Sequence, residues 1–570
     1  MVDFIKTQNT FLNGEVAPEF FALDKLAGLA KLENMDVLSG GGLSRRCGLS
    51  KKAEFTKAAK LVPFSVSDYE QYIIALANER LWILSPNGTL VQSIISPWSY
   101  DEVASVQYAQ RFGTIIFVHQ DHQPRVLKKT QNGFTLSSFA FSVNEDMTQN
   151  IPFMKFDDAE GITITVTANN GGNNYATFTT SSDFWTDDSV GEQILLMGLQ
   201  WNIQSVTNAR VAVAYTNSTY TLPQSPIRNW MEAAFSNRRG WPRSITFHQN
   251  RLVFGGSRDW PSGVWMSQVG KHNNFSVGTG LDDEAIFITL TSQQQQQICT
   301  VVSSDNLQIL TSVGEWAISN KPLTPASVDI KQHTSVGCVA SRYLPPQKIE
   351  GQTVFVSRNM CDIRELSLDD LGENYNANDL CAMSKHLMTG PVDMAYNPGT
   401  RQLFVVMADG TMAVLNQNAG LGISAWGRYV TDGKFLSVAV VDDQTFVVVK
   451  RNDEISLEVF DKNALSDGEF DFSFCACGLP LRASGHNVSR LRIRKIVARV
   501  LNTKSLFINN SRITLPNDVY SDNSDGFSGD VSIGVLGTSR ECINAPWKIH
   551  GNEQLPATVL SVSLFGNYGI

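Results

Sequence analysis

The chain has 570 residues, of which 42% are hydrophobic and 10% aromatic, so it can bury a large core in about two to four domains. Its formal net charge of -9 argues against a general nucleic-acid-binding protein, although a local basic face is compatible with it. No apolar run approaches the roughly 18 residues of a membrane span, and the N-terminal residues lack the apolar region of a secretory signal, so neither is expected.

The first fifty residues have no helix or strand periodicity and precede a long series of predicted β-hairpins. Phenylalanines flank a Gly-Glu-Val-Ala-Pro turn near the start, and two adjacent arginines follow three glycines, which allow close backbone approach. We therefore expect residues 1–60 to form an N-terminal arm that docks on a neighbouring subunit or another protein. The candidate docking residues are Phe11, Gly14, Glu15, Pro18, Arg45 and Arg46.

Beyond about Leu61 the chain consists of short apolar or alternating runs joined by polar turns, with almost no helical periodicity. From Leu307 onward the predicted hairpins recur about every 35 to 50 residues, the spacing of four-stranded propeller blades. Their strands are apolar at nearly every position, as expected of blades that bury both faces. Hairpins are predicted at residues 72–88, 113–133, 244–256, 307–319, 353–366, 401–415 and 435–460.

These patterns predict an all-β protein with a β-propeller core over residues 61–149 and 226–461. The repeat carries no WD or kelch signature, so a chain of β-sandwiches is the alternative fold. A stretch rich in Thr, Asn and Gly interrupts the hairpins and predicts an inserted small β domain at residues 150–225. After Asp461 the pattern changes again, and we expect a C-terminal β domain over residues 462–570.

Two polar clusters have the residue types of metal sites. His119, Asp121 and His122 lie at a predicted hairpin turn, where polar residues are common, and no further ligand is evident in the sequence. The Asp-Asp-Glu run at residues 282–284 lacks the alternating oxygen ligands of a calcium loop. A turn and a solvated loop are the favoured interpretations, and we expect no metal or cofactor.

The sequence contains no nucleophile elbow, P-loop or His-Glu-x-x-His motif, so we expect no enzymatic activity. Its eight cysteines are too scattered for a disulfide framework, which fits folding in a reducing cytosol. Cys475 and Cys477 would share one face of a strand, but no second ligand pair follows at zinc spacing, so a structural role is favoured.

A basic strand is predicted near residue 495, where arginines alternate with apolar residues at the two-residue period of a strand. One face of this strand is therefore cationic. Acidic neighbours that neutralise it are the simpler interpretation, and contact with phosphate or an acidic partner subunit is the alternative. The candidate residues for a channel-facing or partner-facing surface are Arg490, Arg492, Arg494, Lys495 and Arg499.

Two blocks resemble one known family. The opening FLNGEVAPEF, followed by LAGLAKLENMDVLSGGGLSRRCGL, is similar to the N-terminus of nozzle proteins (tail tubular protein B type) of short-tailed bacteriophages. The block from Arg228 to Gly270 is similar to the family's Gly-(Tyr/Trp)-Pro-Arg and Phe-His-Gln-x-Arg-Leu-x-Phe-Gly-Gly series, the most specific part of the likeness. The chain departs from the pattern at Cys47, where many relatives have proline, and it is compact for the family.

The resemblance implies a structural protein of the virion tail that is synthesised in the host cytoplasm. Family members form a six-fold ring below the head-to-tail adaptor, surround and close a channel for DNA exit, and carry fibres or spikes. It therefore implies a homohexamer whose partners are the adaptor ring, the tail fibres or spikes, and duplex DNA that passes without sequence specificity. In the second block, the expected determinants of the propeller fold are Trp241, Pro242, Arg243, His248, Gln249, Arg251, Phe254, Gly255 and Gly256.

Two other functions are alternatives. A receptor-binding tail propeller would bind glycans through aromatic loops, and its candidate residues are Trp98, Trp185, Trp260 and Trp265. A virion-associated cell-wall hydrolase would rest only on scattered carboxylates.

Overall fold

Among the described residues the regular secondary structure is almost entirely β-strand, with one short α-helix, α1 (Tyr100–Val103), and five short 3-10 helices. The computed structural model describes residues 2–22, 26–57, 60–169, 174–319, 321–369, 372, 374–480, 491–515, 526–535, 539–540 and 545–568. The chain divides into two compact units, unit 1 with Met1–Ser93 and Leu344–Ile570, and unit 2 with Ile94–Tyr343. No helix in the described part of the chain is long and apolar enough to cross a membrane.

Unit 1 contains four groups of four antiparallel strands, the arrangement of propeller blades. Three groups are formed by strands consecutive in sequence, and the fourth combines three consecutive strands with β6 from the N-terminal segment. The groups are β7 (Lys60–Ser67), β8 (Glu70–Ala77), β9 (Arg80–Leu84) and β10 (Leu90–Ile95); β30 (Gln347–Ile349), β31 (Gln352–Val356), β32 (Ile363–Leu368) and β33 (Tyr375–Asp379); β34 (Pro391–Asn397), β35 (Gln402–Met407), β36 (Met412–Asn418) and β37 (Ile423–Tyr429); and β38 (Lys434–Val441), β39 (Gln444–Arg451), β40 (Glu454–Asp461) and β6 (Gly48–Phe55).

The first strands of these groups pack beside one another, β7 on β38, β38 on β34 and β34 on β30. Apolar side chains of neighbouring groups fill the space between them; for example, Ile73 and Phe446, both fully buried, belong to one cluster. Every residue of β35 is buried. Because each sheet is covered on both faces, its strands need apolar side chains on both, which explains the continuous apolar runs in the sequence.

Unit 2 contains three further groups of the same kind, in which β11 packs on β22 and β22 on β26. Phe254, at the centre of one group, is fully buried among aromatic rings that include Phe235 and Phe275. The groups are β11 (Gln107–Arg111), β12 (Thr114–His119), β13 (His122–Thr130) and β14 (Gly133–Ser138); β22 (Ser244–His248), β23 (Arg251–Gly255), β24 (Gly263–Met266) and β25 (Ile286–Thr289); and β26 (Ile298–Ser303), β27 (Leu307–Thr311), β28 (Glu315–Ile318) and β29 (Ile330–Thr334).

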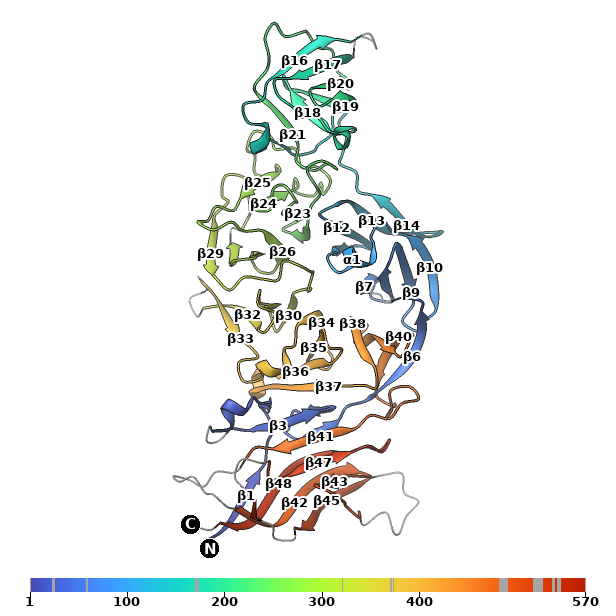
Figure 1. Ribbon diagram of the computed structural model, residues 1–570, viewed down its shortest axis with the longest axis vertical. Helices are drawn as coiled ribbons and strands as arrows, with labels where there is room; N and C mark the ends of the chain where they lie inside the picture. Colours follow the sequence, from blue (N-terminus) through green and yellow to red (C-terminus); the bar gives the residue numbers. More distant parts are fainter. Residues whose placement is uncertain are drawn as a thin grey trace. The chain divides into compact units, whose positions relative to one another are not determined.

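A seven-stranded antiparallel sheet interrupts the series in unit 2 and has its own core around Phe178, Trp201 and Trp230. Figure 1 shows most of its strands as one cyan and green group. Its order is β15 (Phe153–Met154), β21 (Trp230–Ala233), β18 (Gln193–Leu196), β19 (Leu199–Asn208), β20 (Val211–Tyr215), β17 (Tyr175–Thr180) and β16 (Ile164–Ala168).

The two ends of the chain share two sheets of unit 1, as the blue strands among the orange and red strands in Figure 1 show. A common core contains Phe11 and Leu29 from the N-terminal segment and Ile496 and Trp547 from the C-terminal region. One sheet has seven strands: β1 (Val2–Gln8), β4 (Met35–Val37), β5 (Leu43–Arg45), β42 (Leu491–Thr503), β45 (Phe527–Gly534), β46 (Ser539–Arg540) and β48 (Thr558–Tyr568). The other extends β34–β37 to ten strands with β2 (Gly14–Glu15), β3 (Gly28–Glu33), β41 (Phe474–Gly478), β47 (Lys548–Gly551), β43 (Phe507–Ile508) and β44 (Ser511–Arg512).

The predicted fold class, an all-β protein with propeller blades and added β domains, is confirmed. The expectation of a non-periodic arm at residues 1–60 is wrong, because this segment forms β1 to β6, and all of these strands except β4 pair with strands from the C-terminal half of the chain. β2, β4 and β5 are only two or three residues long, too short for a periodic pattern, and the C-terminal partners lie hundreds of residues away in the sequence.

Candidate functional site

Arg46, a candidate docking residue, lies inside unit 1 with a fully buried side chain. Its guanidinium stacks on the ring of Phe472, 3.7 Å from the ring centre. Its five N–H groups donate to the side chain of Asn34, the carbonyl oxygens of Cys47 and Val430, and both carboxylate oxygens of Asp467, at 2.6 to 3.1 Å. A guanidinium has five donors, so the hydrogen-bonding capacity of Arg46 is used completely within the chain.

The guanidinium of Arg45 also lies over the ring of Phe472, 4.4 Å from the ring centre. Its guanidinium donates to four carbonyl oxygens of the C-terminal region, those of Leu465, Phe472, Glu553 and Leu555. Burial and the adjacent Arg46 lower the pKa of Arg45 to about 10, so the group stays protonated at neutral pH. The arginine pair therefore fastens the N-terminal segment to the C-terminal domain of the same chain.

Glu15 is also buried and forms a second polar centre of unit 1. Its carboxylate accepts hydrogen bonds from the backbone of Leu32 (2.8 Å), from His386 (2.9 Å) and from Arg428. Burial opposes the charged form, but the hydrogen bonds from His386, Arg428 and Leu32 outweigh it and lower the pKa of Glu15. Glu15 is therefore ionised and fully paired at neutral pH.

The three remaining candidates of the arm differ in exposure. Phe11 is fully buried, with an edge-on contact to Trp547. Gly14 has φ +60° and lies so close to Trp426 that a Cβ would overlap the backbone there. Pro18 is exposed at the start of a short 3-10 turn, a position where proline fits. Five of the six candidates thus hold the chain's own fold together, which corrects the expectation of free docking side chains.

The predicted basic strand is β42, and its alternation is visible in the structure. Arg492, Arg494, Lys495 and Arg499, which we call the basic face, are exposed. The intervening side chains of Ile493, Ile496, Ala498 and Val500 are buried in the core of the seven-stranded sheet. The register of β42 shifts between Ile493 and Lys495, and as a result the consecutive residues Arg494 and Lys495 are both exposed. Arg490 lies outside the described residues.

Acidic neighbours neutralise half of the basic face. Arg499 forms two hydrogen bonds of 2.7 and 3.0 Å with Asp530 on the adjacent strand β45. Arg494 lies 3.7 Å from Asp3 of β1. Within the described part of the chain, no ion pair includes Arg492 or Lys495.

The predicted fold determinants cluster at the β22–β23 hairpin of unit 2. Gln249 and Asn250 both have positive φ and connect His248 to Arg251, the geometry of a tight two-residue turn. His248 is buried and lies 3.0 Å from the hydroxyl of Ser303. Arg251 is fully buried, and its guanidinium donates to the carbonyl oxygens of Ser267, Asp282, Asp283, Glu284 and Leu323.

The rest of this block has related positions. Pro242 and Phe254 are buried, and a side chain on Gly255 would collide with Val301. Trp241 is half-buried, Arg243 donates to the carbonyl of Ala340, and Gly256 has φ +61°. Burying a residue of the size of Phe254 stabilises a fold by about 1.5 to 3 kcal/mol. The contacts support a role of these residues in folding.

A buried ion-pair cluster in unit 2 was not predicted. Arg239 donates two hydrogen bonds to Glu232 (2.6 and 2.8 Å) and two to Asp158 (2.7 and 3.0 Å). The neighbouring carboxyl of Glu192 is also buried, and burial together with the charge of Glu232 raises its pKa well above the usual value. The adjacent arginines at 238 and 239 were the only sequence signal of this cluster.

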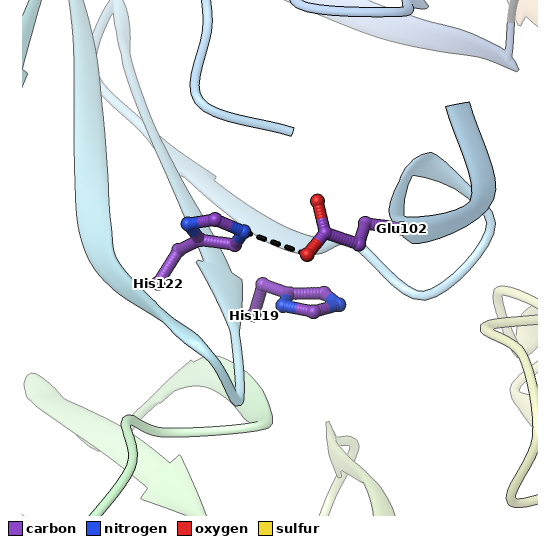
Figure 2. A group of neighbouring side chains, drawn as sticks. All are labelled: Glu102, His119 and His122. Atoms are coloured by element: carbon purple, nitrogen blue, oxygen red, sulfur yellow. Dashed lines mark hydrogen bonds and ion pairs between the residues drawn. The ribbon is translucent and has the colours of Figure 1, made fainter. Parts of the chain in front are cut away.

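The structure also brings together three side chains that could hold a metal ion. His119 ends β12 and His122 begins β13, and their rings lie 5.3 Å apart, centre to centre. Glu102 of α1 joins them, with 2.9 Å between its Oε1 and His122 Nε2 (Figure 2). Burial opposes ionisation of Glu102, but hydrogen bonds from Ser99 and His122 hold its pKa at about 2. Sequence spacing did not reveal Glu102, which lies 17 residues before His119.

The remaining candidates from the sequence are the tryptophans proposed for glycan binding and the cysteine pair. Three of the four tryptophans proposed for glycan binding, Trp98, Trp185 and Trp265, are buried, which corrects that expectation; Trp260 is partly exposed. Cys475 and Cys477 share one face of β41, with 3.7 Å between their sulfur atoms. All seven cysteines that lie in the described part of the chain are free.

Comparison with known proteins finds a family that matches part of the chain. Residues 243–474 match the family model described as bacteriophage nozzle protein. No curated protein sequence matches the chain.

Among solved structures, the chain is similar to the Pan2 WD40 domain of Neurospora crassa, with 10% identity over 63% of this chain and 89% of that chain, at a TM-score of 0.28. It is similar to BamB from Moraxella catarrhalis, with 10% identity over 72% of this chain and 100% of that chain, at a TM-score of 0.32. It is also similar to the RRP9 WD40 repeats, with 8% identity over 73% of this chain and 100% of that chain, at a TM-score of 0.34.

The family match includes most of the β22–β23 block that carried the resemblance in the sequence, and it extends through the last blade of unit 1 to the first residue of β41. The family suspected from the sequence is thus confirmed over residues 243–474, which match the bacteriophage nozzle protein model.

Proposed function

We propose that the chain is a subunit of a ring in a short bacteriophage tail, a homohexamer below the head-to-tail adaptor. The ring forms and gates the channel for DNA ejection and supports fibres or spikes. The match of residues 243–474 to the nozzle family carries this proposal and supports a structural role in the virion tail. Four-stranded blades add rigid elements with few exposed sheet edges, which suits subunits of a closed ring.

The basic face is the surface proposed for contact with the neighbouring subunit of the ring. Two of its four cations already have acidic partners, and the same sheet exposes Ile5, whose side chain is 70% accessible. A surface that combines apolar and cationic side chains suits a protein partner. A surface for the phosphate backbone of DNA would need cationic side chains and no exposed apolar ones. The chain has a net charge of -9, so an acidic surface of a second copy is a suitable counterpart.

Electron microscopy tests the ring. The purified chain is imaged alone and after mixing with heads or virions that lack it. The expected result is a six-fold ring with a channel wide enough for a duplex, seated at the tail vertex. Monomers that never bind the vertex would contradict the proposal and favour a receptor-binding role.

Charge reversal tests the basic face. The double variant Arg492→Glu with Lys495→Glu is expected to prevent ring assembly, because it places anions against an acidic partner. Arg512→Glu, an exposed arginine of β44, is the matched control. If the double variant forms rings and only DNA ejection slows, the basic face lines the channel instead.

The N-terminal region is also proposed to dock on the adaptor. The positions of its residues in the fold determine which deletion can test this. Deleting residues 1–49 would remove Phe11, Arg45 and Arg46 from the core, so loss of assembly would be uninformative. Deleting only β1 removes a strand that, among the described residues, pairs with β48, and it leaves Phe11, Arg45 and Arg46 in place. A folded protein that no longer joins the adaptor would support docking through β1, and normal joining would contradict it.

A further inference from the structure

We propose that Glu102, His119 and His122 bind a divalent transition-metal ion of the zinc class. Each residue offers one ligand atom, and these atoms all lie within 4.8 Å of one another. Two imidazoles and one carboxylate form a ligand set that zinc uses in proteins, with water or another ligand completing the coordination. This site is independent of the proposed role in the tail.

The hairpin fixes the two histidines. His119 and His122 are directly paired across the β12–β13 ladder and are separated only by Gln120 and Asp121. Side chains at paired positions of an antiparallel ladder leave the sheet on the same face, with Cβ atoms about 5 Å apart. Little conformational freedom is therefore lost when both rings bind one ion.

The short helix fixes the carboxylate. Glu102 Oε2 accepts hydrogen bonds from the backbone nitrogen and the hydroxyl of Ser99, both at 2.8 Å, which forms a capping box. This arrangement directs Oε1 toward His122, as Figure 2 shows. One oxygen of the carboxylate is thus anchored, and the other faces the imidazoles.

Asp121 lies beside Nδ1 of His119. Its backbone N–H donates to this nitrogen at 3.3 Å, and its carboxylate lies 3.9 Å away. Metal binding at Nε2 of His119 therefore requires the ring proton to move to Nδ1, on the side of the Asp121 carboxylate. Metal-bound histidines commonly donate their second ring nitrogen to a carboxylate. Arg258 lies 3.9 Å from the other oxygen of Asp121.

The chemistry and the exposure decide the class of ion. Bond lengths of 2.0 to 2.1 Å in a tetrahedral zinc site place ligand atoms about 3.3 Å apart. Glu102 Oε1 and His122 Nε2 are already 2.9 Å apart, so the adjustment falls mainly on His119, whose ligand atom lies within 4.8 Å of the other two. Calcium and magnesium prefer oxygen ligands, and two of the three donors here are nitrogens. His119 is buried, but Glu102 and His122 are 30% and 26% exposed, which leaves a solvent-side approach for an ion.

The test uses the untagged full chain, stripped with a chelator and titrated with zinc. Binding is measured by calorimetry and by competition with a chromophoric chelator, and cobalt replaces zinc in parallel to record its visible d–d absorption. The variants are His122→Ala and Glu102→Gln, both at partly exposed side chains, and His333→Ala on β29 is the matched control.

We expect one ion per chain, bound at least about tenfold more weakly by His122→Ala and by Glu102→Gln than by the wild type and the His333→Ala control. Zinc should raise the melting temperature of the wild type, and cobalt should give a spectrum of nitrogen and oxygen ligands that both variants lose. Equal zinc affinity in all four proteins, or a cobalt spectrum typical of thiolate ligands, would overturn the proposal. Circular dichroism of the variants confirms that lost binding does not reflect unfolding.

Discussion

The buried pair of Arg46 and Asp467 gives the sharpest prediction for stability. The two residues are 421 positions apart in sequence, and their side chains are 0% and 1% exposed. Arg46→Ala removes the guanidinium and leaves the Asp467 carboxylate buried without its cation. The contact of Arg46 with the Phe472 ring is lost as well.

The expected cost follows from the burial. Breaking a buried ion pair by removing one partner destabilises a protein by about 3 to 5 kcal/mol, because the remaining charge keeps its desolvation cost. For a unit of this size about 1 kcal/mol corresponds to roughly 2 °C of melting temperature, so the transition of unit 1 should fall by about 6 to 10 °C. Arg46→Lys should recover only part of this, since an ammonium has three donors and cannot replace the five-donor fork.

Differential scanning calorimetry measures the shift, with limited proteolysis to identify which region opens first. Arg512→Ala is the matched control, because Arg512 pairs with Glu553 at 3.2 Å on the surface of the same unit. An exposed pair contributes about 0 to 1 kcal/mol, so this variant should melt close to the wild type. A double variant that replaces both Arg46 and Asp467 with apolar residues should be more stable than Arg46→Ala.

The reasoning would be refuted by an Arg46→Ala variant that melts within about 2 °C of the wild type, which corresponds to about 1 kcal/mol. It would also fail if Arg46→Ala and Arg512→Ala melted at the same temperature. Loss of assembly without loss of stability would instead indicate that Arg46 contacts another subunit.

Three further predictions concern single side chains. The pKa of Glu15 is lower in the folded protein than in the unfolded chain, where it is about 4.3, so ionised Glu15 stabilises the fold above that pH. This stabilisation is lost as the pH falls through the pKa of the folded state. The difference in melting temperature between the wild type and Glu15→Gln should therefore shrink below about pH 4. Gly14→Ala, with positive φ and no room for a Cβ, should lower the melting temperature, whereas Gly40→Ala, with no atom within 4 Å of its Cβ, should not. The raised pKa of Glu192 makes its ionisation costly as the pH rises, so Glu192→Gln should stabilise unit 2 at neutral or higher pH.

Each of these has a clear contrary result. A gap for Glu15→Gln that stays constant from pH 7 to pH 3 would show that the charge of Glu15 does not stabilise the fold. Equal melting of the two alanine variants would show that the segment at Gly14 moves freely away from Trp426. A Glu192→Gln variant that is less stable at pH 8 than the wild type would mean that the carboxyl is ionised and paired in the folded protein.

The strand content and the blades were predictable because their signals are local. Continuous apolar runs, such as the one that became β35, predict strands covered on both faces, and polar turns separate them. The alternation in β42 likewise predicted that Arg492 and Arg494 would be exposed, since successive residues of a strand point to opposite faces. Lys495 and Arg499 are exposed as well because the register shifts between Ile493 and Lys495. The family was recognisable for a related reason, because its motifs are short and contiguous.

Only the tertiary structure decided what the first fifty residues and the polar side chains do. Gly14, Glu15, Arg45 and Arg46 looked like docking residues, yet their partners lie in the C-terminal half of the same chain. Glu102 was likewise not recognisable from the sequence, because it meets His119 and His122 only in the folded chain. Charge and hydrogen bonding act through space, so a pattern of neighbours along the chain cannot reveal which distant groups desolvate and pair with one another.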